Sequence, residues 1–227
     1  MPFQLQHVVP WGRSFDEYVA MFALTTDDLR ARILGCGDGP AAFNAEATRR
    51  RARVVSVDPL YQCSPGDIRA RIAATADTVA AQTREHAEEF VWTHVPDVET
   101  LIATRMTAMR AFLSDFDAGR AGGRYVSAEL PRLPFRDGTF DLAICSHFLF
   151  LYSAQYDIDF HVAAITELCR VASDVRIFPL LELGSVPSRH LDGVISAISA
   201  HGCVSRARVP YEFQRGGNEM LRIVRRA

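Results

Sequence analysis

The sequence predicts an α/β protein in which a mostly parallel, seven-stranded sheet is covered by helices on both faces and ends with an antiparallel strand. Three observations indicate this doubly wound fold. Short β-branched apolar runs alternate with amphipathic segments, the first turn between them is rich in glycine, and two runs at the end of the chain face each other across a glycine turn. A length of 227 residues suits a single domain, here 1–227, with an inserted piece.

The charge composition restricts the classes of partner. All 25 basic residues are arginine, and against 27 acidic residues the formal net charge is −2. We therefore expect no broad positive field, and no binding to nucleic acid or to a membrane. The absence of lysine excludes Schiff-base chemistry and a phosphate-loop lysine. The basic run Arg49–Arg53 is interpreted as the charged end of a helix, where arginine opposes the helix dipole.

The cysteines indicate neither disulfides nor a metal site. Their number, five, is odd, they are widely scattered, and no histidine lies at zinc spacing from them. We expect reduced, mostly buried thiols, no bound metal and a cytoplasmic location. The amino terminus lacks a basic start followed by a long apolar run, and no stretch approaches 18 apolar residues, so neither export nor membrane spanning is predicted.

The first part of the chain follows a strand, glycine turn, helix, strand order. Ser14 and Glu17 have the spacing of a capping box, which predicts a helix that begins after Ser14 and reaches about Leu24. A strand ends at Ile33–Leu34, and Pro40 suits the first turn of the next helix. The ranges expected here are a helix over 40–50 and a buried strand over 53–58.

Residues 61–120 interrupt this alternation. Two helices are expected there, one starting after Ser64 with apolar residues from Ile68 to Phe90 on one face, the other starting near Asp97 with a face from Val98 to Phe116. We interpret this segment as a helical insertion after the second strand that forms a lid or a dimer surface. Beyond the loop at 119–123 we expect strands over 124–130, 141–145, 175–181, 203–213 and 219–225, and helices over 153–172 and 187–200.

Two motifs indicate a nucleoside ligand. Gly35-Cys36-Gly37-Asp38-Gly39 follows a strand and precedes a helix, so bare backbone can approach a ligand at the carboxyl edge of the sheet. Asp58 ends the next strand, 19 residues beyond Gly39, where a carboxylate can accept both hydroxyls of a ribose. Nicotinamide cofactors remain an alternative, but their pyrophosphate usually requires G-x-G-x-x-G, whereas Pro40 and Ala41 follow here.

From about Arg32 to its carboxyl end, the chain resembles the class I S-adenosylmethionine-dependent methyltransferases, which have a Rossmann-like sheet. Residues 1–30, expected to form an amino-terminal cap, and the insertion lie outside the common pattern. The resemblance implies that the glycine turn wraps the methionine part of the cofactor, that Asp58 binds the ribose, and that Pro59 and Leu60 lie against the adenine. Where the family often has an acid two residues before the first glycine, this chain has Ile33.

A second stretch extends the resemblance. Glu129-Leu130 followed by Leu133-Pro134-Phe135 and Phe140-Asp141 is similar to the family's acid-then-LPF pattern. It implies that Glu129 accepts a hydrogen bond from the adenine amino group and that the Leu130 amide bonds the ring. Ser146 and His147 correspond to the segment beside the methyl group.

The predicted function is methyl transfer from S-adenosylmethionine to an unidentified acceptor, expected to be a small molecule. Alignment and exclusion of water can supply most of the acceleration, and His147 is the candidate base if the acceptor must lose a proton. A structural role for His147 is equally consistent with its position. Trp11, Arg13, Tyr18 and Tyr152 are candidate acceptor-pocket residues, although Trp11 and Arg13 also fit a core anchor and a solvated side chain. A non-catalytic sensor and a nicotinamide-dependent oxidoreductase are the alternatives, and we expect a monomer or homodimer.

Overall fold

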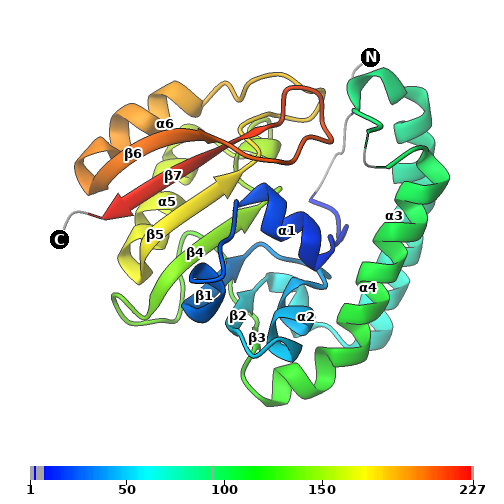
Figure 1. Cartoon of the computed structure of the whole chain (residues 1–227), viewed down its shortest axis with the longest axis horizontal. Coiled ribbons are helices and arrows are strands. Elements are labelled where there is room, and N and C mark those ends of the chain that lie inside the picture. Colours follow the sequence, from blue (N-terminus) through cyan, green and yellow to red (C-terminus); the bar gives the residue numbers. More distant parts are fainter. Residues whose placement is uncertain (1–2, 4–7, 94, 226–227) are drawn as a thin grey trace.

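The computed structural model describes residue 3 and residues 8–93 and 95–225. Its centre is a seven-stranded sheet with the order β3-β2-β1-β4-β5-β7-β6 (Figure 1). All pairings among β1 to β5 are parallel, and β7 runs antiparallel to both of its neighbours. The predicted fold class is therefore confirmed. The strands are β1 Arg32–Cys36, β2 Arg53–Val57, β3 Tyr125–Val126, β4 Phe140–Ser146, β5 Ala172–Phe178, β6 Gly202–Arg208 and β7 Glu219–Arg225.

The strand order reverses next to β1. Its register pairs Cys36 with Val57 of β2 on one side and with Cys145 of β4 on the other. The connections that leave β1 and β4 therefore run to opposite sides of the sheet. In open α/β sheets, the crevice outside the carboxyl ends of the strands at such a switch point is where ligands bind.

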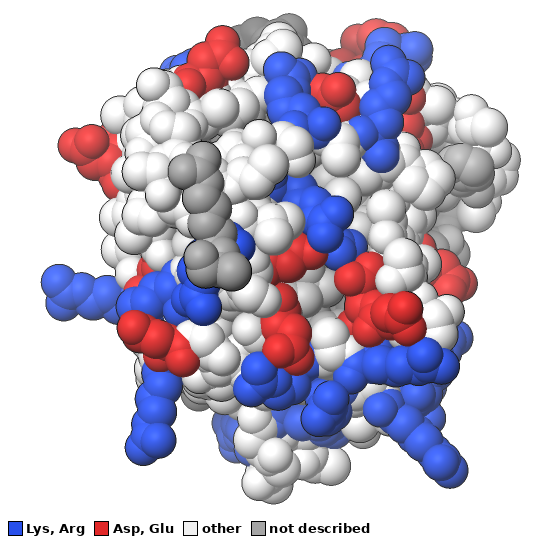
Figure 2. Space-filling model, turned by 60° about the vertical axis from the view of Figure 1, so that its left-hand side comes forward, with Lys and Arg blue, Asp and Glu red and all other residues white. Residues whose placement is uncertain are grey.

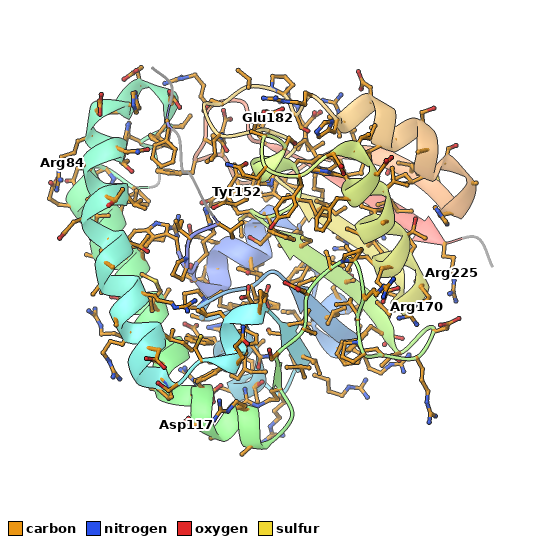
Figure 3. All side chains as sticks on the ribbon, turned by 180° about the vertical axis from the view of Figure 1, so that it is seen from behind. Arg84, Asp117, Tyr152, Arg170, Glu182 and Arg225 are labelled. Atoms are coloured by element: carbon orange, nitrogen blue, oxygen red, sulfur yellow. The ribbon has the colours of Figure 1, made fainter. Side chains whose placement is uncertain are left out.

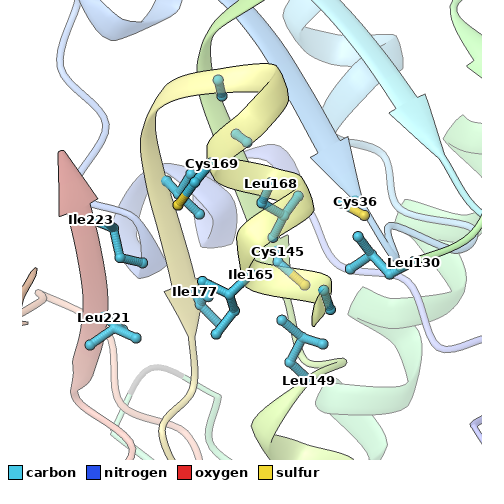
Figure 4. Packing of buried hydrophobic residues seen from close by; sticks show 14 of the residues in the cluster. Cys36, Leu130, Cys145, Leu149, Ile165, Leu168, Cys169, Ile177, Leu221 and Ile223 are labelled. Atoms are coloured by element: carbon cyan, nitrogen blue, oxygen red, sulfur yellow. The ribbon is translucent and has the colours of Figure 1, made fainter. Parts of the chain in front are cut away.

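Alternate residues of the central strands face two separate apolar layers, which is why helices cover both faces. Ile33 packs with Phe15 and Phe43, from the helices α1 Phe15–Met21 and α2 Phe43–Arg49. Leu34 faces the other layer, which α5 Ile158–Val171 and α6 Leu191–Ile198 complete (Figure 4). The Ser14–Glu17 capping box at the start of α1 is confirmed.

The helical insertion is also confirmed. Its helices, α3 Pro65–Glu85 and α4 Val98–Ala121, lie side by side at the β3 end of the sheet (Figure 1). Phe112 and Phe116 of α4 are fully buried and pack with Tyr61 and Tyr125, so an aromatic cluster fixes the insertion to the edge strand. One wall of helix thus extends past the carboxyl edge of the sheet.

Several predicted boundaries were wrong. The strand expected over 124–130 is only Tyr125–Val126, because it pairs with β2 alone and the chain then turns, with the Arg132 N–H donating to the Glu129 carbonyl. The helix expected over 40–50 begins at Phe43, since residues 37–42 form the turn, and Gly119 belongs to α4. The other elements whose bounds differ from those expected are α1, α3, α5, α6, β1, β2, β4, β5 and β6.

The surface and the thiols agree with the composition. The face seen in Figure 2 carries arginine and acidic side chains next to one another. Cys36, Cys145 and Cys169 are buried and all five cysteines are free thiols. Within the described part of the chain, no helix combines the length and apolar character needed to cross a membrane. The single-domain prediction for 1–227, with 1–30 as a cap, stays a prediction, and residues 1–2 and 4–7 lie outside the described residues.

Candidate ligand-binding site

A cavity of about 520 Å³ opens at the carboxyl ends of β1, β2 and β4 and extends to the insertion. Every predicted site residue except Gly35 lines it. The lining residues predicted to contact the cofactor are Cys36, Gly37, Asp38, Gly39, Asp58, Pro59, Leu60, Glu129, Leu130, Ser146 and His147. The lining residues predicted for the acceptor pocket are Trp11, Arg13, Tyr18 and Tyr152.

The glycine turn depends on backbone that only glycine adopts easily. Gly37 and Gly39 have φ angles of +66° and +51°, in the left-handed region. The Gly37 N–H donates to the Val57 carbonyl at 3.0 Å, which ties the turn to the exit of β2. Gly35 lies beneath the turn, where an added Cβ would come within 1.9 Å of the Asp38 Oδ2. Gly35 therefore makes room for Asp38 and does not itself line the cavity.

Asp38 supports the turn from below. Its carboxylate accepts hydrogen bonds from the Tyr18 hydroxyl at 2.9 Å and the Ser56 hydroxyl at 2.6 Å. Burial raises the pKa of Asp38 to about 7, although both hydrogen bonds favour the charged form. This arrangement connects α1, the turn and β2, so that the predicted cofactor residue Asp38 also positions the turn.

Asp58 fits the ribose role predicted for it. Its Oδ2 accepts from the Gly39 N–H at 2.9 Å and its Oδ1 from the Leu60 N–H at 2.8 Å, which fixes the orientation of the carboxylate. A carboxylate has about four acceptor sites, so two remain for the hydroxyls of a ribose. Burial, with a smaller effect of the Glu129 charge, raises the pKa of Asp58 to about 6.

The part of the cavity expected to hold a nucleobase combines apolar walls with the carboxylate of Glu129. Leu60 and Leu130 are buried, while Glu129 is exposed at the rim. Tyr156 stacks on Phe160 with ring centroids 4.3 Å apart, and both rings line the cavity. Tyr156 and Phe160 were not predicted as site residues, because nothing local in the sequence separates them from other packed aromatic residues.

His147 lies at the exit of β4 in an unusual backbone conformation. Its φ is +50°, uncommon for a residue other than glycine, and its N–H donates to the Phe178 carbonyl at 2.7 Å. Its Nδ1 lies 3.0 Å from the Ser146 hydroxyl. Burial, together with the charges of Arg13 and Arg105, lowers the pKa of His147 well below its ordinary value. Burial and the two arginines therefore favour the neutral imidazole and make it a weaker base than an exposed histidine.

The segment before α1 covers the cavity next to His147. The Tyr152 hydroxyl accepts from the Val9 N–H at 3.3 Å, and Figure 3 shows Tyr152 between the insertion and the strands. Arg13 donates from Nη1 to the Trp11 carbonyl at 3.2 Å, but its Nε is buried with no hydrogen-bond partner. Burial and the nearby Arg105 lower the pKa of Arg13, which still remains charged.

The residues that the insertion contributes to the cavity lining were not predicted from the sequence. Arg105 of α4 is fully buried, lines the cavity and forms an ion pair with Glu17 of α1. The sequence does contain an indication that Arg105 is buried, because it falls on the apolar face of α4, four residues from both Leu101 and Met109. The other insertion and loop residues lining the cavity include Val79, Thr83, Phe90, Leu183, Gly184, Phe213 and Gln214.

The loop that connects β6 and β7, here called the hairpin loop, closes the cavity against the insertion. The Val91 N–H donates to the Phe213 carbonyl at 2.7 Å and the Arg215 N–H to the Glu89 carbonyl at 2.8 Å. Phe90 stacks on Phe213 with centroids 4.8 Å apart. Among the described residues, no group of three or more metal-ligating side chains could hold a metal ion.

The fold is that of a doubly wound α/β protein with a cavity at the switch point of its sheet. No family model matches the chain. The uncharacterized protein MJ0045 of Methanocaldococcus jannaschii is 32% identical over 223 residues, which cover 98% of this chain and 98% of that protein. The chain belongs to the family of that archaeal protein.

Solved structures with a related architecture were also found. The PH0226 protein of Pyrococcus horikoshii OT3 is 12% identical, with a TM-score of 0.47 over 87% of this chain and 82% of that chain. Magnesium protoporphyrin IX methyltransferase (ChlM) of Synechocystis PCC 6803, solved with bound SAM, is 15% identical, with a TM-score of 0.48 over 93% of this chain and 78% of that chain. At these values the likeness does not assign an activity, which must come from the residues of the site.

Proposed function

We propose that this protein binds S-adenosylmethionine in the cavity and transfers its methyl group to a small-molecule acceptor. The observation that carries the proposal is the joint placement of the glycine turn and Asp58 on one cavity at the carboxyl ends of β1 and β2. Gly39 donates directly to Asp58, so the two motifs form one unit. Two free acceptor positions on a fixed carboxylate match the paired hydroxyls of a ribose.

The bound cofactor supplies an electrophilic methyl group on a positively charged sulfur. The chain would then orient the acceptor and keep water out, a contribution for which effective molarities reach roughly 10⁵ to 10⁸ M. The enclosing parts are the segment before α1, the insertion and the hairpin loop, all of which line the cavity. Asp38 and Asp58 place negative charge on the wall facing a cationic ligand, and binding of a cation would favour their ionised forms.

Calorimetric titration with S-adenosylhomocysteine and, separately, NAD tests the ligand class. We expect S-adenosylhomocysteine to bind and NAD not to, because Pro40 and the G-x-G-x-G spacing disfavour a pyrophosphate at this turn. Binding of NAD alone would replace this proposal with the oxidoreductase alternative.

Incubation with methyl-labelled S-adenosylmethionine and the small-molecule fraction of a cell extract tests catalysis. We expect label in a small molecule. If the cofactor binds but no label is transferred, the protein is a sensor or interaction module and the proposed activity is wrong.

A further inference from the structure

The part of the cavity beyond His147 has an apolar wall and a positive floor. Val79 and Leu101 of the insertion, Phe90 at its tip, Leu183, and Phe213 of the hairpin loop form the wall. Arg13 and Arg105 form the floor. None of these residues belongs to the glycine turn or the Asp58 segment, and we call this part of the lining the second lobe.

The floor carries one positive charge more than its carboxylate can balance. Glu17 is the acidic partner, and it already accepts hydrogen bonds from Ser14, Arg105 and the Tyr211 hydroxyl. Arg105 uses Glu17 as its ion-pair partner. The second guanidinium, Arg13, has a buried Nε without a hydrogen-bond partner.

Arg13 is half-buried and its Nη1 has a partner, but a buried Nε–H without one is costly unless a ligand completes it. An unpaired polar group costs roughly 1 to 3 kcal/mol, and more when it is charged. The planar guanidinium matches the two oxygens of a carboxylate. The cofactor does not remove the excess charge, since its sulfonium and ammonium groups outnumber its single carboxylate.

Next to Arg13 and Arg105, His147 is the side chain placed to accept a proton, because the lining carboxylate of Glu89 already accepts a hydrogen bond from the Phe3 N–H at 3.0 Å. His147 is a weaker base than an exposed histidine because of burial and the two arginines. Asp38 and Asp58 are engaged by Tyr18, Ser56, Gly39 and Leu60. An acceptor atom that is already ionised at neutral pH needs no base.

From these contacts, we propose that the acceptor is a small apolar carboxylic acid, whose carboxylate is bound by Arg13 and receives the methyl group. This inference rests on the proposed function. In the reaction, a bond forms between a carboxylate oxygen and the methyl carbon while the carbon–sulfur bond breaks. The bonding electron pair goes to sulfur, both charges disappear, and the products are a methyl ester and S-adenosylhomocysteine with no proton transferred.

Binding of matched probes tests the anion site. Protein saturated with S-adenosylhomocysteine is titrated with 3-phenylpropionate and with its uncharged amide, which has a similar shape. We expect the acid to bind at least about tenfold more tightly, and Arg13→Gln to abolish this preference while the affinity for S-adenosylhomocysteine stays within about twofold. Arg13→Lys should retain part of the preference, and Arg110→Gln, an exposed arginine of α4, all of it.

Three results would overturn the anion site. They are equal or absent binding of both probes to the wild-type protein, an unchanged preference in a folded Arg13→Gln variant, and a loss of S-adenosylhomocysteine affinity of about tenfold or more in that variant. The last result would assign Arg13 to the carboxylate of the cofactor. If S-adenosylhomocysteine does not bind the wild type at all, the proposed function fails, and the probe comparison on the unliganded protein still decides whether Arg13 binds an anion.

The chemistry of the labelled product tests the attacked atom. Mild alkali releases the methyl group of an ester as methanol, whereas ethers and methylated amines are stable. We expect alkali-labile label from the wild type and its loss with Arg13→Gln. Alkali-stable label would contradict carboxyl methylation while leaving methyl transfer intact.

Discussion

Asp58 is a carboxylate held by two backbone N–H groups with two acceptor positions left, and this makes it the most informative single residue of the cofactor site. Asp58→Ala should weaken binding of S-adenosylhomocysteine by about 1 to 3 kcal/mol, because ribose hydroxyls would lose a charged acceptor. Calorimetry measures this directly. Asp117→Ala, at an exposed site on α4 (Figure 3), serves as the control, and equal affinities for the two variants would remove Asp58 from the site.

The raised pKa values of Asp58 and Asp38 predict a pH dependence of binding. Both carboxyls hold their protons more tightly than usual, with pKa values of about 6 and about 7. As the pH falls through this range they become neutral and attract a sulfonium less, so the affinity for S-adenosylmethionine should fall between about pH 8 and about pH 5. S-adenosylhomocysteine, which lacks the sulfonium charge, should show a smaller decrease. Titrations at several pH values check this, and a larger decrease for S-adenosylhomocysteine would contradict it.

The ends of β1 and β2 explain why much of the lining of the cavity could be predicted from sequence. Gly37 and Asp58 lie at the ends of adjacent parallel strands, so local patterns brought them together. Arg105 and Phe213 reach the cavity only through packing of α4 and the hairpin loop, which no local pattern encodes. For the same reason, the expected strand over 124–130 overestimated β3, whose length depends on its single partner.

The turn between β1 and α2 gives a prediction at the scale of an element. Gly37 has a positive φ, and an added Cβ would come within 3.0 Å of Phe148 at the cavity wall. Gly37→Ala should therefore lower the affinity for S-adenosylhomocysteine by at least about tenfold. Gly123 is a matched control, since it also has a positive φ but an added Cβ there meets nothing within 4 Å. Calorimetry on both variants should show normal affinity only for Gly123→Ala. Normal affinity for both would disprove a close approach of the Gly37 backbone to the ligand.

The insertion is held to the edge of the sheet mainly by aromatic packing. Phe112 is fully buried among Tyr61, Phe116 and Tyr125. Phe112→Ala should lower the free energy of unfolding by about 3 to 5 kcal/mol, because it leaves a cavity in this cluster. Denaturant unfolding measures the loss. The exposed Arg110→Ala on the same helix should change stability little, and a similarly small effect of Phe112→Ala would show that the insertion is docked by other contacts.

At the scale of the molecule, one cavity joins segments that are far apart in the chain. The segment before α1, the switch point of the sheet, the insertion and the hairpin loop all contribute lining residues. The contact of residues 89–91 with 213–215 includes residues that line this cavity, and it connects the insertion to the last strand pair. A ligand bound inside would contact every layer of the fold, so we expect cofactor binding to stabilise the whole protein and not only the turn.

The structure of the protein crystallised with S-adenosylhomocysteine tests the cofactor site most directly. We predict electron density for the ligand at the carboxyl ends of β1 and β2, with both ribose hydroxyls within hydrogen-bond distance of Asp58 and the sulfur directed toward His147. Ligand density elsewhere on the molecule, or a ribose that makes no contact with Asp58, would contradict the proposed site.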